Sequence, residues 1–359
     1  TVDLTKPLKV LDLCAAPGGK STLIQSLISD DSLLVCNEVI KPRVNILIEN
    51  LTKWGAENVV VTNNDPAHFQ RIPDYFDVIV VDAPCSGSGL FRKEPEAVQE
   101  WSENNVTLCN QRQQRILHDV IPALKPGGIL IYSTCSYSYE ENEHISLWLQ
   151  DEKKLKALPL KIENEWGIIE TENQNGYRFF PDKTDGEGFF LQVLQKTEGA
   201  SLSSSRKQPI SKIKPHSFAS PWIKKDVPNL FWTMQDEIRF ANNLLIEELP
   251  FLQANLYIKK AGVRIGSSIR GEHIPDHELA MCLNILNAEM NSIDIDYHTA
   301  ISYLKREAFM LADAKTGWQL LKYQHIPIGF IKALANRINN YYPTRSEEHT
   351  SELQSRVDI

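Results

Sequence analysis

The chain has 359 residues, of which 42% are hydrophobic, and it carries a formal net charge of −8 at pH 7. This length allows roughly two to three domains, and the apolar content is sufficient for a real core. The acidic balance argues against a protein that coats nucleic acid indiscriminately. Because the sequence has no apolar run of about 18 residues and no signal-peptide pattern, we expect a cytoplasmic protein that does not enter membranes.

The N-terminal half alternates strand-like and helix-like segments. Apolar, β-branched runs predict strands buried on both faces at residues 8–13, 33–36, 59–62, 76–81 and 128–132. Helical periodicity between them predicts helices at residues 21–28, 39–54 and 96–124. This order predicts an α/β fold with a doubly wound, Rossmann-like parallel sheet, whose ligands bind at the carboxyl ends of the strands.

The first predicted strand leads into a glycine-rich turn, Cys14-Ala-Ala-Pro-Gly-Gly-Lys20. Glycines let the backbone approach a ligand closely, and the helix that follows offers free N–H groups. The turn matches neither the Walker pattern nor GxGxxG, so alone it indicates only some nucleotide site. After the next two strands, Glu38 is placed to hold ribose hydroxyls, and Asp65 could accept a hydrogen bond from an adenine amino group. Without its neighbours, Glu38 is equally well interpreted as a surface carboxylate.

Two later turns each carry a cysteine after a predicted strand. They are Asp82-Ala-Pro-Cys-Ser-Gly-Ser-Gly89 and Ser133-Thr-Cys-Ser-Tyr137. A lone cysteine in such a place is more often a small core side chain than a nucleophile. Two of them, each in a polar turn at the same edge of a sheet, favour a nucleophile and a helper, so we expect Cys85 and Cys135 to face one crevice.

The other cysteines indicate neither a metal site nor a disulfide framework. The six cysteines lack the spacing of metal ligands and the density of a disulfide scaffold, so we expect free thiols and no metal. Cys14 is expected to pack beside the cofactor, and we interpret Cys36, Cys109 and Cys282 as structural.

Together these motifs resemble those of the RNA (cytosine-5) methyltransferases of the RsmB/NSUN family. The resemblance covers residues 9–194, where Tyr177-Arg-Phe-Phe-Pro181 and Gly186-Glu-Gly-Phe-Phe190 are similar to the family's last strand pair. It implies that S-adenosyl-L-methionine is the methyl donor, that Cys135 is the nucleophile that adds to carbon 6 of cytosine, and that Cys85 assists release. The implied cofactor-binding residues are Cys14, Ala15, Ala16, Pro17, Gly18, Gly19, Lys20, Glu38, Asp65 and Asp82.

Two charged residues of these motifs have more than one possible role. Asp82 is positioned to hydrogen-bond the cytosine amino group and ring nitrogen, or alternatively the methionine or adenosine part of the cofactor. Lys20 could lower a thiol pKa or orient the substrate, or it could instead cap the turn. Because carbon 6 is accessible only on an unstacked base, the RNA must be single-stranded there or its cytosine flipped out.

The C-terminal part contains basic segments and a second resemblance. Residues 206–225 hold six Lys or Arg and no acid among prolines and serines, and residues 301–344 hold six bases against two acids. A solvated surface and contact with phosphates explain these charges equally well. The motifs Ala300-X-X-Tyr-Leu-Lys-Arg306, Gly317-Trp318 and Ile328-Gly-Phe-Ile-Lys332 resemble a PUA-like RNA-binding domain of this family. That resemblance implies ribosomal RNA or the small ribosomal subunit as the partner.

The predicted organisation has five parts. They are a catalytic domain at 1–198, a basic linker at 199–225, a small intermediate domain at 226–290, a PUA-like domain at 291–344 and a tail at 345–359. The tail resembles a translated sequencing adapter, so we expect it to be foreign to the fold, and we expect the family's N-terminal RNA-binding extension to be missing. We expect the protein to be a monomer.

Two other functions compete with RNA methylation. In DNA cytosine-5 methylation the cysteine of a Pro-Cys motif is the nucleophile, and Pro84-Cys85 fits that pattern. The Thr134-Cys135 motif and the RNA-binding C-terminal part argue against this function. A non-catalytic ribosome-assembly factor could also retain a cofactor fold, but the intact cofactor and cysteine motifs argue against it.

Overall fold

A computed structural model of the protein describes residues 2–172, 176–197, 221–228, 230–234, 237–269 and 272–344. The predicted tail, and the predicted linker as far as residue 220, lie outside these residues. By its internal contacts the chain divides into two compact units. The first comprises Thr1–Leu47, Val59–Ile210 and Glu247–Lys260, and the second comprises Ile48–Asn58, Ser211–Ile246 and Ala261–Ile359.

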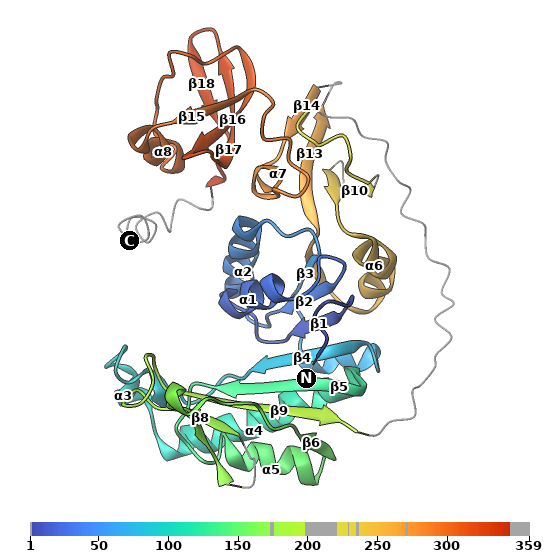
Figure 1. Ribbon diagram of the computed structural model, residues 1–359, viewed down its shortest axis with the longest axis vertical. Coiled ribbons are helices and arrows are strands. Elements are labelled where there is room, and N and C mark those ends of the chain that lie inside the picture. The colour runs from blue at the N-terminus through green and yellow to red at the C-terminus, as the bar shows by residue number, and fades with distance from the viewer. Residues whose placement is uncertain are drawn as a thin grey trace. The chain divides into compact units, whose positions relative to one another are not determined.

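A sheet that has ten strands in the described part of the chain forms the centre of the first unit (Figure 1). Its parallel strands are β1 (Lys9–Asp12), β2 (Leu33–Asn37), β3 (Val59–Thr62), β4 (Phe76–Asp82) and β5 (Leu124–Thr134). They lie in the order β3-β2-β1-β4-β5, which reverses between β1 and β4. Ligands of doubly wound sheets bind at the carboxyl ends of the strands beside such a reversal. The predicted Rossmann-like α/β fold is confirmed.

Both edges of this sheet carry further strands. Antiparallel β9 (Phe189–Lys196) follows β5, with β8 (Tyr177–Phe179) and β7 (Ile169–Glu170) beyond it. The other two are β6 (Leu155–Ala157), which pairs with β9, and β12 (Ile258–Ala261), which lies next to β3. The central strands read as continuous apolar runs because both of their faces are covered, as expected for parallel strands.

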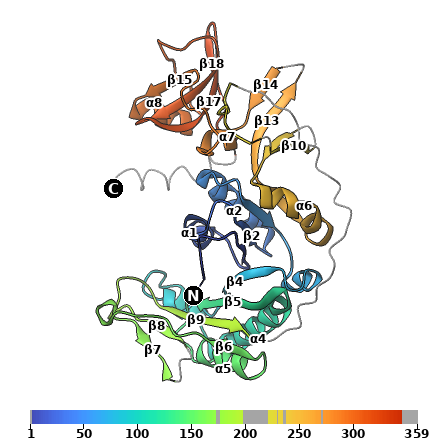
Figure 2. The same ribbon diagram turned by 45° about the vertical axis from the view of Figure 1, so that its right-hand side comes forward.

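Helices cover this sheet. Figures 1 and 2 show α4 (Glu103–Val120) and α5 (Glu143–Asp151) on one face of β4, β5 and β9, while α1 (Gly19–Leu27) and α2 (Lys41–Trp54) lie together beside β1–β3. The aromatic ring of Phe251, in α6 (Asn243–Asn255), stacks on that of Tyr75, with the ring centroids 5.5 Å apart.

No helix in the described ranges is long and apolar enough to cross a membrane.

The continuous helix predicted at residues 96–124 is wrong. The structure has α3 (Ala97–Glu100), then α4, then the short 3₁₀ turn η3 (Ile121–Ala123). The break occurs at Ser102, which is extended (φ −156°, ψ 157°) and whose hydroxyl accepts a hydrogen bond from the Asn105 amide at 3.1 Å. A serine in this role starts a new helix, because its side chain satisfies an amide that has no partner within the helix.

The second unit contains two four-stranded sheets in its described residues. One consists of β10 (Phe231–Met234), β11 (Glu237–Phe240), β13 (Val263–Ile269) and β14 (Glu272–Pro275), which is followed by α7 (His277–Met281). The other consists of β15 (Ser292–Ile295), β16 (Gly317–Tyr323), β17 (Ile326–Leu334) and β18 (Arg337–Asn340). Helix α8 (Tyr297–Leu304) packs on the latter through fully buried Tyr303, whose hydroxyl donates to the Phe330 carbonyl at 3.3 Å.

Candidate active site

The turns after β4 and β5 lie side by side at the carboxyl edge of the sheet. Asp82 and Ser133 are register partners, and the Ala83 amide donates to the Ser133 carbonyl at 2.8 Å. Beyond this point the two chains remain adjacent, so that the Sγ atoms of Cys85 and Cys135 are 3.0 Å apart. The structure therefore brings together the two thiols that the sequence analysis singled out.

The two thiols differ in how readily they ionise. The hydrogen bond between the sulfurs raises the pKa of Cys85, and burial raises it further. The same hydrogen bond lowers the pKa of Cys135, against the opposing effect of burial. A thiolate that accepts a hydrogen bond is stabilised, whereas the thiol that donates it must keep its proton. Cys135 is therefore the sulfur that becomes the nucleophilic thiolate more easily.

Close backbone contacts hold the two cysteine turns together. The Gly89 amide donates to the Cys135 carbonyl at 2.6 Å, and the Tyr137 amide donates to the Ser88 hydroxyl at 2.8 Å. A Cβ atom on Gly89 would lie 2.3 Å from the Cys135 carbonyl oxygen, which is closer than real Cβ contacts. Glycine is therefore required at this position by the approach of the second turn.

Asp82, the last residue of β4, has two side-chain partners. Its Oδ1 accepts a hydrogen bond from the Ser133 hydroxyl at 2.8 Å, and its Oδ2 is 2.7 Å from Lys20 Nζ. The Lys20 amino group also lies 5.5 Å from the centroid of the Phe189 ring. Lys20 thus reaches from the glycine-rich turn to the Asp82 carboxylate, and both charged side chains are partly exposed.

The glycine-rich turn joins β1 to α1. Gly18, the residue that precedes the helix, has φ 118°, a left-handed conformation that favours glycine. The Ala15 amide donates to the Asn37 carbonyl at 2.9 Å, and the Ala16 carbonyl accepts from Arg43 at 2.6 Å. A Cβ on Gly19 would meet nothing within 4 Å, so the space beside the turn is open.

The residues of this turn that precede Gly18 are mostly apolar. Ala15 and Ala16 are buried, and Pro17 precedes Gly18. Burial raises the pKa of the Cys14 thiol, which keeps it neutral. This agrees with a packing role for Cys14 rather than a chemical one.

The two predicted acids after β2 and β3 occupy different environments. Glu38 is only 3% exposed, so it is not a surface carboxylate; it accepts a hydrogen bond from the Ile40 amide at 2.9 Å and lies 3.4 Å from Arg43. Asp65 caps the short helix η1 (Pro66–Arg71) by accepting from the Ala67 amide at 3.0 Å. The capping role of Asp65 was not predicted from the sequence.

Asp12, at the end of β1, was missed by the sequence analysis. Its carboxylate is fully buried: Oδ2 accepts from the Ser21 hydroxyl at 2.7 Å, while Oδ1 has no hydrogen-bond partner. Burial raises its pKa from 3.8 to about 6. An acid at the last position of an otherwise apolar strand was the signal that could have revealed it. A buried carboxylate oxygen without a donor is costly unless a ligand supplies one.

These groups match the chemistry of S-adenosyl-L-methionine. That molecule carries an ammonium group, ribose hydroxyls and an adenine amino group, all of which donate hydrogen bonds. The carboxylates of Asp12, Glu38 and Asp65 are acceptors at the ends of three adjacent strands. The start of α1 and the open glycine turn leave room and N–H groups for the donor's carboxylate.

The sheet topology and the glycine turn at its reversal point, together with the matching family model, identify a Rossmann-like, S-adenosyl-L-methionine-dependent methyltransferase. The family model described as 16S rRNA methyltransferase RsmB/F matches residues 2–195, and the chain belongs to this family. A second model, described as methyltransferase RsmF PUA domain, matches residues 290–345. The family and the C-terminal PUA domain predicted from the motifs are confirmed.

Individual proteins agree with this assignment. The chain is 29% identical over 358 residues to ribosomal RNA small subunit methyltransferase F of Escherichia coli O6:H1 (strain CFT073), covering 95% of this chain and 74% of that protein. Over 356 residues it is 28% identical to the protein of the same name from Escherichia coli strain K12, with the same two coverages.

Solved structures match just over half of this chain. The crystal structure of the protein PH0851 is 31% identical, with a TM-score of 0.50 over 54% of this chain and 44% of that one. NSun6 from Pyrococcus horikoshii, solved with SFG, is 29% identical, with a TM-score of 0.48 over 54% of this chain and 48% of that one. The matched region thus makes up less than half of either solved chain.

Proposed function

We propose that the protein transfers a methyl group from S-adenosyl-L-methionine to carbon 5 of cytidine in small-subunit ribosomal RNA, through a covalent bond between Cys135 and carbon 6. The observation that carries this proposal is the 3.0 Å separation of the Cys85 and Cys135 sulfurs beside the Asp82 carboxylate. Family membership and the names of the relatives support ribosomal RNA as the substrate.

The paired thiols suit a reaction at a carbon that is a poor nucleophile. Addition of the Cys135 thiolate to carbon 6 turns the cytosine ring into an enamine, whose carbon 5 can attack an electrophile. When bound, S-adenosyl-L-methionine supplies the methyl group on a positively charged sulfur. The lowered pKa of Cys135 supports its role as the attacking sulfur.

Cys85 suits the second half of the reaction. After methyl transfer the proton on carbon 5 must leave, so that the ring electrons can return and expel the Cys135 sulfur. The pKa of Cys85 is raised chiefly by its hydrogen bond to Cys135. That cause disappears once the Cys135 sulfur is bound to carbon 6 and neutral, and burial alone then raises the pKa of Cys85. The Cys85 thiol can then lose its proton to water, and the resulting thiolate accepts the proton from carbon 5.

Asp82 is proposed to bind the amino group and ring nitrogen of cytosine. The Ser133 hydroxyl orients one of its oxygens, and Lys20 balances its charge at 2.7 Å. As the thiolate adds, the ring nitrogen takes up a proton, and the Asp82 carboxylate favours this protonation by accepting a hydrogen bond from the resulting N–H group. Contact with the cofactor remains the alternative role of Asp82.

The cofactor site is proposed to comprise the turn from Cys14 to Lys20 and three carboxylates. Glu38 would accept hydrogen bonds from the ribose hydroxyls, and Asp65 would accept one from the adenine amino group. Asp12 would accept one from another donor group of the cofactor through its unpartnered Oδ1.

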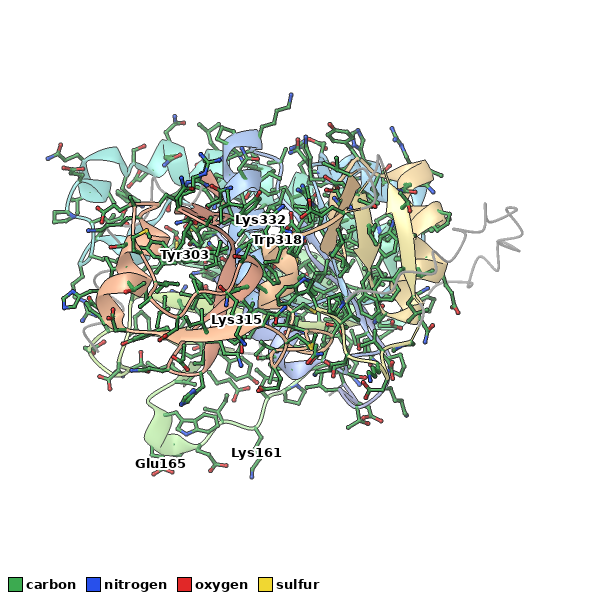
Figure 3. All side chains as sticks on the ribbon, turned by 90° about the horizontal axis from the view of Figure 1, so that it is seen from above. Lys161, Glu165, Tyr303, Lys315, Trp318 and Lys332 are labelled. Atoms are coloured by element: carbon green, nitrogen blue, oxygen red, sulfur yellow. The ribbon has the colours of Figure 1, made fainter. Side chains whose placement is uncertain are left out.

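RNA binding is proposed for the PUA domain. The ring centroids of Trp318 and Tyr341 are 4.4 Å apart. The amino group of Lys332 lies 5.5 Å from the centroid of the Trp318 ring (Figure 3). Aromatic rings and lysines are the side chains that bind unstacked bases and phosphates.

One experiment tests the assignment of the thiols. Purified protein is incubated with radiolabelled S-adenosyl-L-methionine and unmodified small-subunit ribosomal RNA or small subunits. We expect Cys135→Ala to abolish methyl transfer and Cys85→Ala to accumulate a covalent protein–RNA adduct that survives denaturing gel electrophoresis. Cys109→Ala, at a buried cysteine of α4, is the control that should retain activity.

Each alternative has its own outcome in this assay. An adduct trapped by Cys135→Ala would assign the nucleophile to Cys85. Methyl transfer to duplex DNA, with none to RNA, would favour the DNA methyltransferase. A wild-type protein that binds ribosomal RNA but transfers no methyl group to it would favour the assembly factor.

A further inference from the structure

We propose that Glu141 is a positioning residue that clamps the two cysteine turns together, and this inference rests on the proposed function of Cys85 and Cys135. Glu141 lies in the segment between β5 and α5, and nothing in the motif pattern alone assigns it a task. Its side chain is fully buried behind the two turns. It would act on the reaction through the two thiols and not by touching the substrate.

The carboxylate of Glu141 joins the residues that directly follow the two cysteines. Its Oε1 accepts from the Ser86 amide at 2.8 Å, and its Oε2 accepts from the Ser86 hydroxyl at 2.5 Å. The same Oε2 accepts from the Ser136 hydroxyl at 2.6 Å. One carboxylate therefore bonds the neighbour of Cys85 and the neighbour of Cys135 simultaneously.

A third element and the backbone fix the clamp itself. Gln113 of α4, also fully buried, donates to Glu141 Oε1 at 3.1 Å and to the Pro84 carbonyl at 3.1 Å. The Glu141 carbonyl accepts from the Tyr132 hydroxyl at 2.6 Å. Glu141 is thus held from α4 and from β5 while it holds the two turns.

Energetic considerations favour a positioning role over simple packing. A carboxylate in the protein interior carries a large desolvation cost, which is offset only when its oxygens are fully hydrogen-bonded. The four donors to Glu141 are neutral groups, namely one amide N–H, two hydroxyls and one side-chain amide. An apolar side chain could fill the same volume at lower cost, but it could not fix the separation of two polar turns. Such a network specifies one arrangement of the groups that it connects.

The test variant keeps the shape of the Glu141 side chain and removes its charge. In Glu141→Gln the amide oxygen can still accept from the Ser86 amide and Gln113, while the two serine hydroxyls must reverse and accept from the new NH₂ group. The fold is thereby retained, but the hydroxyl bonds that join the turns are weakened, since charge-assisted bonds are roughly twice as strong as neutral ones. Glu140→Gln, at the exposed preceding residue, is the matched control.

The first measurement reports on the thiols without RNA or cofactor. Diamide oxidises two adjacent thiols to a disulfide: each sulfur loses a hydrogen atom, and the azo group of diamide becomes a hydrazine. We expect rapid formation of the Cys85–Cys135 disulfide in the wild type and in Glu140→Gln, detected as a linked peptide by mass spectrometry. Glu141→Gln should form it about tenfold more slowly, because the sulfurs spend less time at contact.

The second measurement uses the reaction. We expect Glu141→Gln to lower kcat for methyl transfer about tenfold or more, with little change in KM for S-adenosyl-L-methionine, because its donors lie in the cysteine turns and α4. Thermal unfolding establishes that the variant is folded. If Glu141→Gln is not folded, Ser136→Ala, which removes one joining hydroxyl, carries the same expectation with a smaller effect.

The outcomes separate this inference from the proposed function. A folded variant with wild-type rates of both oxidation and methyl transfer overturns the positioning role of Glu141. Slower oxidation in a protein whose wild type methylates no cytidine supports the clamp and overturns the proposed function instead.

Discussion

The two halves of the site are built differently. Behind the thiols, both oxygens of the buried Glu141 carboxylate are paired within the protein, where they join the turns through Ser86 and Ser136. Around the glycine turn, Asp12 has a buried oxygen without a partner, and a Cβ on Gly19 would face open space. The thiol half is therefore held together by the protein alone, whereas the proposed cofactor half keeps a buried acceptor that its proposed ligand would pair.

The largest expected effect concerns Asp82, which lies where the two halves meet. In Asp82→Asn the Ser133 hydroxyl keeps an acceptor, but Lys20 loses its charge partner and the cytosine ring loses the carboxylate. We expect the single-turnover rate of methyl transfer to fall about 10²–10⁴-fold. The rate of diamide oxidation of the thiols should not fall, because the thiol turns are held by other bonds and the Asp82 charge raises the pKa of Cys135.

A control variant on the same carboxylate sharpens this prediction. Ser133→Ala removes only the orienting hydroxyl, so it should slow methyl transfer by about tenfold or less. Equal losses in Asp82→Asn and Ser133→Ala would mean that orientation, and not the carboxylate charge, accounts for the effect.

The second prediction concerns the stability of the cofactor half. Because burial raises the pKa of Asp12 from 3.8 to about 6, the folded protein binds the proton more tightly than the unfolded chain. The stability that this provides is fully present below pH 3.8 and is lost as the pH rises through 6. We therefore expect the ligand-free Asp12→Asn variant to be more stable than the wild type at pH 8, by up to about 3 kcal/mol.

Urea unfolding at pH 4 and pH 8 measures this difference. The gain should nearly vanish at pH 4, where the wild-type carboxyl is largely protonated, and the variant should bind S-adenosyl-L-methionine more weakly at pH 8. Ser21→Ala, which removes the hydroxyl that bonds Asp12, should instead destabilise the protein at pH 8. Lower stability of Asp12→Asn at pH 8 would refute a ligand-completed cofactor half.

The third prediction uses the unequal thiols. Because the hydrogen bond from Cys85 lowers the pKa of Cys135, Cys135 should react with iodoacetamide at a pH below the ordinary range of a thiol, about 8.5. Reactivity falls about tenfold for each pH unit below the pKa of the reacting thiol. In Cys85→Ala this hydrogen bond is lost, so the reactivity profile of Cys135 should move to higher pH. Alkylation followed by mass spectrometry measures both profiles, and a shift to lower pH would contradict the assignment.

The sequence predicted the strands well because parallel strands buried on both faces must be apolar throughout. The run predicted at residues 59–62 coincides with β3 (Val59–Thr62). The turns were also predictable, since small and polar residues follow each strand. By contrast, the helix break at Ser102 depends on one side-chain cap, which periodicity does not reveal.

Contacts between distant segments could not be predicted in the same way. The hydrogen bonds of Glu141 join it to Ser86, 55 positions earlier in the chain, and to Ser136, five positions earlier. No spacing rule connects these three residues. Likewise, the acid at the end of β1 is visible in the sequence, but the absence of a partner for its buried Oδ1 is not. These features depend on tertiary packing, which the local pattern does not specify.

The smallest prediction extends the comparison to Lys332 of the PUA domain, a cation that already pairs with an acid of strand β14, outside that domain. Lys332 Nζ lies 2.6 Å from Glu272, which also accepts from the Trp318 indole at 3.1 Å. The lysine and the indole lower the pKa of Glu272, so it remains an anion that competes with RNA phosphate. Glu272→Gln should therefore tighten binding of a ribosomal RNA fragment by about two- to fivefold, since exposed ion pairs are worth less than about 1 kcal/mol.

Fluorescence anisotropy at two salt concentrations measures this gain, and a charge-matched control isolates its cause. Asp313→Asn removes one negative charge from an exposed turn of the PUA domain, so it tests whether net charge alone tightens binding. A larger gain in Glu272→Gln than in Asp313→Asn, accompanied by a steeper salt dependence, means that Lys332 has been freed to contact phosphate. Equal gains in the two variants would mean that Lys332 and Trp318 do not contact the RNA, so that another face of the domain must bind it.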